Sequence, residues 1–206
     1  MSTIYTLQVT NNSTQFQDLC VYQKQVDFGV PNAVSLAWLT APAWPGTTVT
    51  FTWSQDYSFM WAQTGSLKPG ITFKAQQTVA ADPDNLQSNQ IEFNYQNGAF
   101  MFVHGPAAGT PQLGSLYIRE LSAIPANIAA VGIGMSNAGT IVVAAQPNIN
   151  LVFTPHPEYW LTAGTFTQGE VLDVEEITNE INVPFRGTFS MQAVLNAENT
   201  WSITSG

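Results

Sequence analysis

Strict alternation of apolar and polar residues is the feature that most constrains the fold of this chain. Between residues 48 and 53, Val49, Phe51 and Trp53 alternate with threonines, and residues 189–195 alternate in the same way. Only a pleated strand places such apolar residues on one face, so both segments predict half-buried strands. Similar runs recur along the chain at spacings of roughly 8–15 residues, separated by turn-forming residues, as in β-sandwiches.

Turn residues between neighbouring runs predict hairpins. Asn97-Gly98 is the strongest such signal, because both residues tolerate the positive φ that a tight hairpin turn requires. Asn137-Ala138-Gly139 predicts a second hairpin, and Ser54-Gln55-Asp56 predicts a third, which would join the aromatic runs 48–53 and 57–61. Helical spacing of apolar residues occurs only in 170–181 and, interrupted by a proline, in 119–130.

The length and composition fit one large all-β domain. The chain has 206 residues, of which 45% are hydrophobic and only 9% are charged. We therefore predict an all-β fold: a single antiparallel two-sheet β-sandwich of the jelly-roll type, spanning residues 1–206, with at most one or two short helices.

The charge balance excludes several classes of partner. Fourteen acidic residues against five Lys and Arg give a formal net charge of −9, which disfavours binding to nucleic acids and to anionic membranes. The scarcity of Lys leaves few strand edges protected, and residues 130–145 carry no charge at all. We therefore expect a homo-oligomer in which a second copy covers an edge of this segment.

The start of the chain predicts its location. It has neither a basic segment nor a continuous apolar run of the kind that directs secretion. We expect a cytoplasmic protein, or one exported without a classical signal peptide.

The sequence contains no recognisable catalytic motif. His104 and His156 are the only histidines, and neither lies in a metal-ligand or nucleophile pattern. Gly132-Ile133-Gly134 lacks the third glycine and the helix of a nucleotide-binding loop, so close packing in a strand explains it better. Cys20 lies in an apolar run and is predicted to be a buried, inert thiol. We expect no catalytic residues, no metal, no cofactor and no enzymatic activity.

The candidate binding residues lie in loops. Trp44 stands between two prolines, where we expect an exposed ring, whereas Trp53 and Trp61 share the apolar faces of their strands and are assigned to the core. Asp82, Asp84 and Asn85 lie in a long polar loop and complete the candidate ligand-binding set. A carbohydrate or another neutral molecule would suit these residues. Calcium binding by the acidic segment 168–181 is left open, although a solvated face is favoured.

Several short strings resemble a known family. They are Leu7–Ser13, Asn32–Trp38, Val49–Trp53, Asp56–Trp61 and Thr64–Gly70. In these strings, clearest over the first eighty or so residues, the chain resembles the RhiA-like family of rhizosphere-expressed bacterial proteins. The resemblance implies a soluble bacterial protein linked to quorum-regulated expression and to interaction with plants, and it brings no catalytic residues.

These observations favour a non-enzymatic binding or structural β-sandwich connected with bacterium–plant interaction. Two alternatives stay open. One is a membrane-active sandwich resembling the aegerolysins, which are also small, acidic and rich in aromatic residues. The other is a metal-dependent enzyme using His104, His156 and carboxylates such as Glu158.

Overall fold

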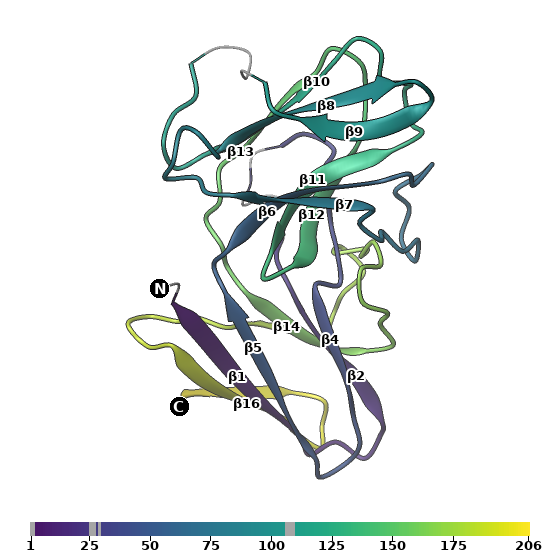
Figure 1. Ribbon diagram of the computed structural model, residues 1–206. Coiled ribbons are helices and arrows are strands. Elements are labelled where there is room, and N and C mark those ends of the chain that lie inside the picture. The colour runs from purple at the N-terminus through teal and green to yellow at the C-terminus, as the bar shows by residue number, and fades with distance from the viewer. Residues whose placement is uncertain (1–2, 25–27, 29, 106–109) are drawn as a thin grey trace.

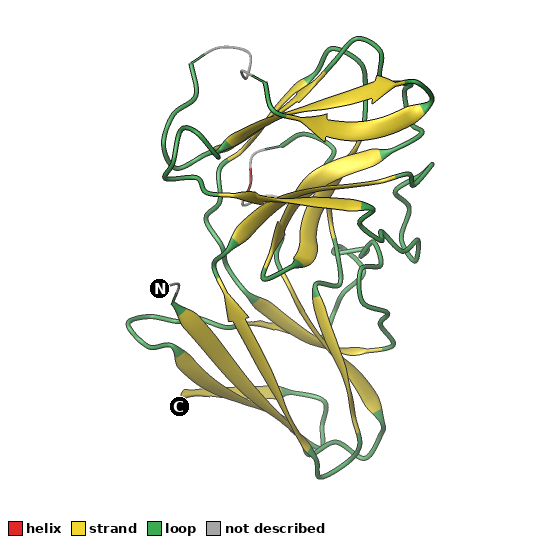
Figure 2. Ribbon diagram, viewed as in Figure 1, coloured by secondary structure: helices red, strands yellow, loops and turns green. Residues whose placement is uncertain are grey.

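The chain folds almost entirely into β-strands (Figure 2). The computed structural model describes residues 3–24, 28, 30–105 and 110–206, and within these ranges it contains 17 strands and no α-helix. The all-β prediction is confirmed. The prediction of a two-sheet jelly roll is wrong, because the strands form four sheets. Alternation indicates which residues of a strand face a core, but it does not determine which strands pair.

One sheet contains the first and the last strand of the chain. This sheet and the sheet that faces it are called here the terminal pair. They lie at the bottom of Figure 1. Their orders are β17-β16-β1-β5 and β15-β14-β2-β4. The bounds are β1 (Ile4–Asn11), β2 (Gln17–Tyr22), β4 (Leu39–Ala43), β5 (Thr48–Ser54), β14 (Trp160–Gly164), β15 (Glu180–Asn182), β16 (Ser190–Leu195) and β17 (Trp201–Ser205).

The other two sheets come from the middle of the chain and form the central pair, at the top of Figure 1. Their orders are β13-β10-β8-β9 and β3-β12-β11-β6-β7. The bounds are β3 (Val34–Ser35), β6 (Tyr57–Ala62), β7 (Gln77–Ala81), β8 (Gln90–Gln96), β9 (Ala99–Val103), β10 (Leu116–Glu120), β11 (Ala130–Met135), β12 (Ala138–Ala144) and β13 (Asn150–Phe153).

The run of aromatic residues from 48 to 61 does not form the predicted hairpin. β5 pairs with β1 in the terminal pair, whereas β6 pairs with β11 and β7 in the central pair. The segment between them is therefore a crossing from one pair of sheets to the other. Trp53 and Trp61 are both buried, as predicted, but they lie in different cores.

The other two predicted hairpins are present. β8 and β9 are joined through Asn97 and Gly98, which have φ values of 53° and 82°, and β11 and β12 form the second antiparallel hairpin. The strands are mainly antiparallel, as predicted, but β1 pairs in parallel with β16, and β10 in parallel with β8.

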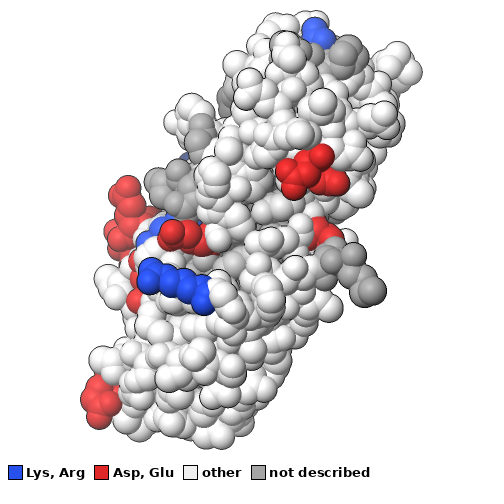
Figure 3. Space-filling model, turned by 90° about the vertical axis from the view of Figure 1, so that its left-hand side faces the viewer, with Lys and Arg blue, Asp and Glu red and all other residues white. Residues whose placement is uncertain are grey.

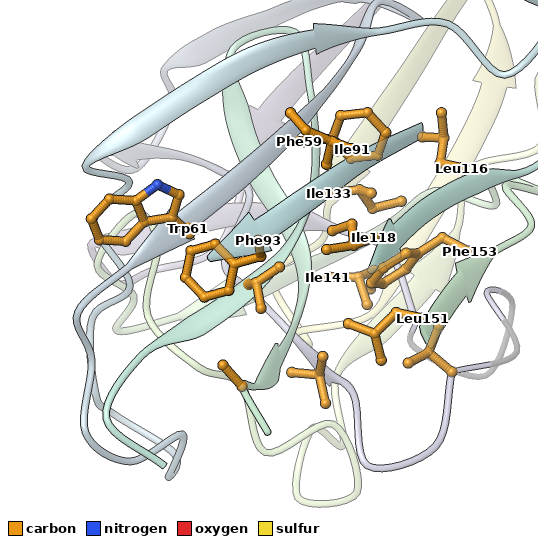
Figure 4. Packing of buried hydrophobic residues seen from close by; sticks show 14 of the residues in the cluster. Phe59, Trp61, Ile91, Phe93, Leu116, Ile118, Ile133, Ile141, Leu151 and Phe153 are labelled. Carbon is orange, nitrogen blue, oxygen red and sulfur yellow. The ribbon is translucent and has the colours of Figure 1, made fainter. Parts of the chain in front are cut away.

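Each pair of sheets encloses its own hydrophobic core. In the central pair, the inward residues of both sheets interdigitate around Phe59, Phe93, Ile118 and Phe153 (Figure 4). In the terminal pair, Trp53 packs with side chains of both sheets. Alternate residues along each strand supply these cores, which is the burial pattern that the sequence periodicity predicts.

Among the described residues, the two cores meet near the end of β11, where Tyr57 and Ala138 of the central pair also pack with the terminal core. Met135, at the end of β11 in the central pair, packs with the terminal core. The buried Trp38 donates a hydrogen bond from Nε1 to the carbonyl oxygen of Met135, at 2.9 Å. This contact fixes one pair of sheets against the other.

The segment 170–181, in which apolar residues have helical spacing, forms no helix: residues 170–179 form turns and isolated bridges, and β15 begins at Glu180. Val171 and Leu172 are buried, and Leu172, Val174 and Ile177 pack with Cys20 and its neighbours on the face of the β15-β14-β2-β4 sheet that points away from the terminal core. The apolar residues of this segment thus cover a sheet, although their spacing resembles that of a helix.

The uncharged segment 130–145 lies inside its sheet. β6 pairs with β11 on one side, and β3 pairs with residues 141–142 of β12 on the other. Gly132 and Gly134 are packed closely, since a Cβ on Gly132 would lie 2.1 Å from the carbonyl oxygen of Ile141. The hairpin is therefore covered from within the chain along its β11 edge, whereas its β12 edge is paired with β3 only at residues 141–142. Self-association stays a prediction.

Candidate functional site

A cleft at one side of the central pair is the candidate site. Its volume is about 620 Å³. It lies between β13, which is the edge of one sheet, and the end of β12, where the short β3 no longer pairs. The described residues that line it are Val30, Pro31, Asn32, Glu120, Asn127, Val143, Ala144, Gln146, Ile149, Asn150, Leu151 and Val152.

Glu120 is the one charged residue in this described lining. It is the last residue of β10, where Leu116 and Ile118 point into the central core and Tyr117 and Arg119 point outward. Because side chains alternate along a strand, Glu120 has the inward parity. Only 2% of it is exposed, so a carboxyl group occupies a position where the pattern calls for an apolar residue.

Few groups stabilise the charged form of this carboxyl. Among the described residues, the backbone N–H of Gln146 donates to Oε1 at 3.2 Å, and no Lys, Arg or His side chain forms an ion pair with this carboxyl. Burial raises the pKa of Glu120 from 4.5 to about 8, and the hydrogen bond from Gln146 opposes this rise. The side chain is therefore a buried acid that takes up and releases its proton near neutral pH.

Amide side chains complete the polar part of the cleft. Gln146 Nε2 donates to Asn127 Oδ1 at 2.6 Å, and the backbone N–H of Asn127 donates to the carbonyl of Ala145 at 3.0 Å. Asn32 and Asn127 have positive φ values, 57° and 58°, a conformation that asparagine adopts more readily than most residues. The local turns thus position the amides around an otherwise apolar cleft.

The predicted ligand-binding residues lie elsewhere. Trp44 is 65% exposed, as expected, and stands in the turn between β4 and β5 of the terminal pair. Its ring packs against that of Phe16, with 4.8 Å between the ring centroids. The loop that holds Asp82, Asp84 and Asn85 follows β7 in the central pair. The structure therefore does not bring the four predicted residues together.

The loop at Asp82 is organised by hydrogen bonds of its own. Asp82 Oδ1 accepts from the N–H of Asp84 at 2.9 Å, and the N–H of Asn85 donates to the Asp82 carbonyl at 3.1 Å. Asn85 Oδ1 accepts from the N–H of Gln87 at 3.0 Å. These side chains shape the turn, and their use by a ligand stays a prediction.

The other residues singled out from the sequence do not converge in the described structure. His104 and His156 are both exposed, and no group of three or more His, Cys, Asp or Glu side chains in the described ranges could hold a metal ion. In the acidic segment, Glu180 forms an ion pair with Lys24, with 2.5 Å between Oε1 and Nζ, and accepts a hydrogen bond from the Tyr22 hydroxyl. Cys20 is fully buried, as predicted, and burial raises the pKa of its thiol.

The surface is largely uncharged. On the face shown in Figure 3, the charged side chains form small, separate groups on a mostly neutral surface. Among the described residues, no helix has the length and apolar character needed to span a lipid bilayer.

Glu120 was absent from the sequence-based candidates, although the sequence contains its signal. The alternation in residues 115–119 predicts a strand, and the structure extends this strand by one residue, to Glu120. Extending the parity of Leu116 and Ile118 by one step places Glu120 on the core face. The cleft itself could not be predicted, because residues 30–32, 120–127 and 143–152 meet only through the pairing of strands.

Fold and cleft together define an all-β protein of two facing-sheet pairs, with a small-molecule-sized cleft that contains a buried carboxyl group. The chain belongs to the RhiA family, whose model matches residues 2–206. It is 38% identical over 205 residues to Protein RhiA of Rhizobium leguminosarum bv. viciae, and the match covers 98% of this chain and 86% of that protein. No solved structure matches significantly. The family resemblance found in the N-terminal strings therefore extends over the whole chain.

Proposed function

We propose that this protein is a non-enzymatic binding protein that takes a small organic molecule into the cleft beside Glu120. The observation that carries the proposal is the make-up of the cleft. Its volume of about 620 Å³ lies in the range of ligand sites, and its described lining combines apolar walls with a few polar groups. Val143, Leu151 and Val152 supply apolar surface, while Glu120 and the amides supply hydrogen bonds.

Binding without chemical conversion is favoured by the contents of the cleft. Glu120 is the one titratable side chain in its described lining, and no described Ser, Cys, His or Lys stands beside it as a nucleophile or second proton carrier. Membership of the RhiA family is consistent with a role in the rhizosphere, so we propose that the ligand is encountered in bacterium–plant interaction.

The experiment is a fluorescence titration with Nile red, a neutral dye whose emission rises in apolar surroundings. We expect saturable binding to the protein and a loss of affinity of about tenfold or more in Ile149→Trp, whose larger ring narrows the cleft. Ile149 is 40% exposed, so the added ring need not disturb the core.

The matched control is Leu113→Trp, an exposed position outside the described lining of the cleft. It adds the same ring and should bind Nile red as the unmodified protein does. Equal affinities in the two variants, or no saturable binding at all, would contradict the proposed function.

A further inference from the structure

The unusual group in the cleft is a carboxylate with unused acceptor capacity. An ionised carboxylate offers about four acceptor positions, and the described residues fill one of them, through the N–H of Gln146 at 3.2 Å. The group lines the cleft and is 2% exposed. A ligand that enters there meets this carboxylate.

No described positive charge of the protein compensates it. Arg119 lies on the opposite face of β10 and pairs with Glu92, at 3.2 Å. The segments packed around Glu120, residues 30–35, 121–130 and 143–152, contain no Lys, Arg, His, Asp or Glu. Glu120 is thus the single titratable group facing the cleft from the described elements that form it.

A metal ion is a poor candidate for the missing cation. Calcium and magnesium take six or more oxygen ligands, commonly from several carboxylates. The cleft offers one carboxylate among apolar side chains, and no described cluster of metal-binding residues includes it. An organic cation matches both components, since its charged end meets the carboxylate and its apolar body meets Val143, Leu151 and Val152.

We propose that the cleft binds an organic monocation, an ammonium group carried on an apolar body, with the ammonium against the Glu120 carboxylate. This inference rests on the proposed function and replaces the expected neutral ligand with a positively charged one. The net charge of −9 attracts such a cation. Because burial raises the pKa of Glu120 to about 8, the ammonium displaces the carboxyl proton to solvent as the ion pair forms.

The test compares three probes with one body: 2-phenylethylamine, 2-phenylethanol and phenylacetate. By calorimetry at pH 7, we expect the amine to bind about tenfold or more tightly than the alcohol, and phenylacetate to bind most weakly. Repeating the titration in buffers of different ionisation enthalpy should show proton release with the amine alone.

The discriminating variant is Glu120→Gln, which keeps the shape of the side chain and removes its charge. It should abolish both the preference for the amine and the proton release, while 2-phenylethanol and Nile red bind as before. Glu198→Gln makes the same substitution at an exposed position in the turn between β16 and β17, and it should leave all affinities unchanged.

The outcomes separate the two proposals. If Nile red binds in the cleft but the alcohol matches the amine, or if Glu120→Gln retains the preference, the monocation proposal is wrong and the binding function stands. If neither Nile red nor any of the three probes binds, the proposed function fails as well.

Discussion

The two pairs of facing sheets differ in how their cores end. In the terminal pair, the core closes on an aromatic cluster, in which the ring of Trp53 lies 4.9 Å from Tyr159, 5.4 Å from Phe185 and 5.5 Å from Trp38, measured between centroids. In the central pair, the inward side of β10 ends at Glu120 and the cleft. The two pairs of sheets thus share one architecture, but rings fill the end of the terminal core, whereas the end of the central core leaves space beside a polar group.

The largest expected effect tests the closed core. Trp53→Ala should lower the free energy of unfolding by about 3–5 kcal/mol, because Trp53 is 1% exposed and its removal leaves a cavity among the surrounding rings. Urea denaturation followed by circular dichroism measures the change. A loss below about 1 kcal/mol would mean that the cluster collapses around the gap and that the terminal core is not tightly packed.

The next effect tests the open core through pH. In the folded protein Glu120 keeps its proton up to about pH 8, whereas its ordinary pKa is 4.5, so between these values the folded state binds more protons than the unfolded chain. The free energy of unfolding should therefore fall as the pH rises from about 5 to 8, by up to about 1.4 kcal/mol per pH unit.

The control for this slope is Glu120→Gln, which cannot ionise and should flatten it. Glu198→Gln corrects for general changes in net charge and should keep the slope. Urea denaturation at a series of pH values measures the slope in the unmodified protein and in both variants. A slope that survives in Glu120→Gln would show that Glu120 is not its cause.

A smaller effect tests the connection between the pairs. Trp38→Phe keeps a ring but removes the hydrogen bond to the carbonyl of Met135, which should cost about 1–3 kcal/mol because the buried acceptor loses its donor. The hydrogen bond between Trp38 and Met135 joins the two cores, and we therefore expect the whole chain to unfold as one unit. Tryptophan fluorescence and release of Nile red from the cleft should then share one midpoint in urea, and separate midpoints would show two independent units.

The smallest effect is expected at the exposed aromatic pair. Trp44→Ala should change the free energy of unfolding by no more than about 0.5 kcal/mol, because Trp44 is 65% exposed and lies outside both cores. Thermal unfolding measures this change against Trp53→Ala. A comparable loss in the two variants would erase the distinction between surface and core tryptophans.

The sequence predicts local structure here better than the arrangement of the strands. The alternation at 48–53 and the turn at Asn97-Gly98 specify their strands and hairpin, because both depend on neighbouring residues. The separation of β5 from β6 depends on distant partners, β1 and β11, and the same residue pattern fits a hairpin equally well. For this reason four sheets replaced the expected two.

The same limit applies to the site. The inward parity of Glu120 is a local property and could be predicted from Leu116 and Ile118. The depth of its burial depends on residues 30–32 and 143–152, which lie far away in sequence. For Trp44, the neighbouring prolines predict that the ring is exposed. They do not predict a function for it.

The parallel pairing of β1 with β16 has a consequence for biosynthesis. Thr6 lies opposite Ser190 in this pairing, so one neighbour of β1 is made long after β1 itself. At about 5–20 residues per second, a ribosome needs about ten to forty seconds to reach it. The central strands can pair during that interval, while β1 waits with one edge unsatisfied. Nascent chains should therefore acquire the cleft before the terminal sheets are complete, and a chaperone that shields the exposed edge of β1 would act in this interval.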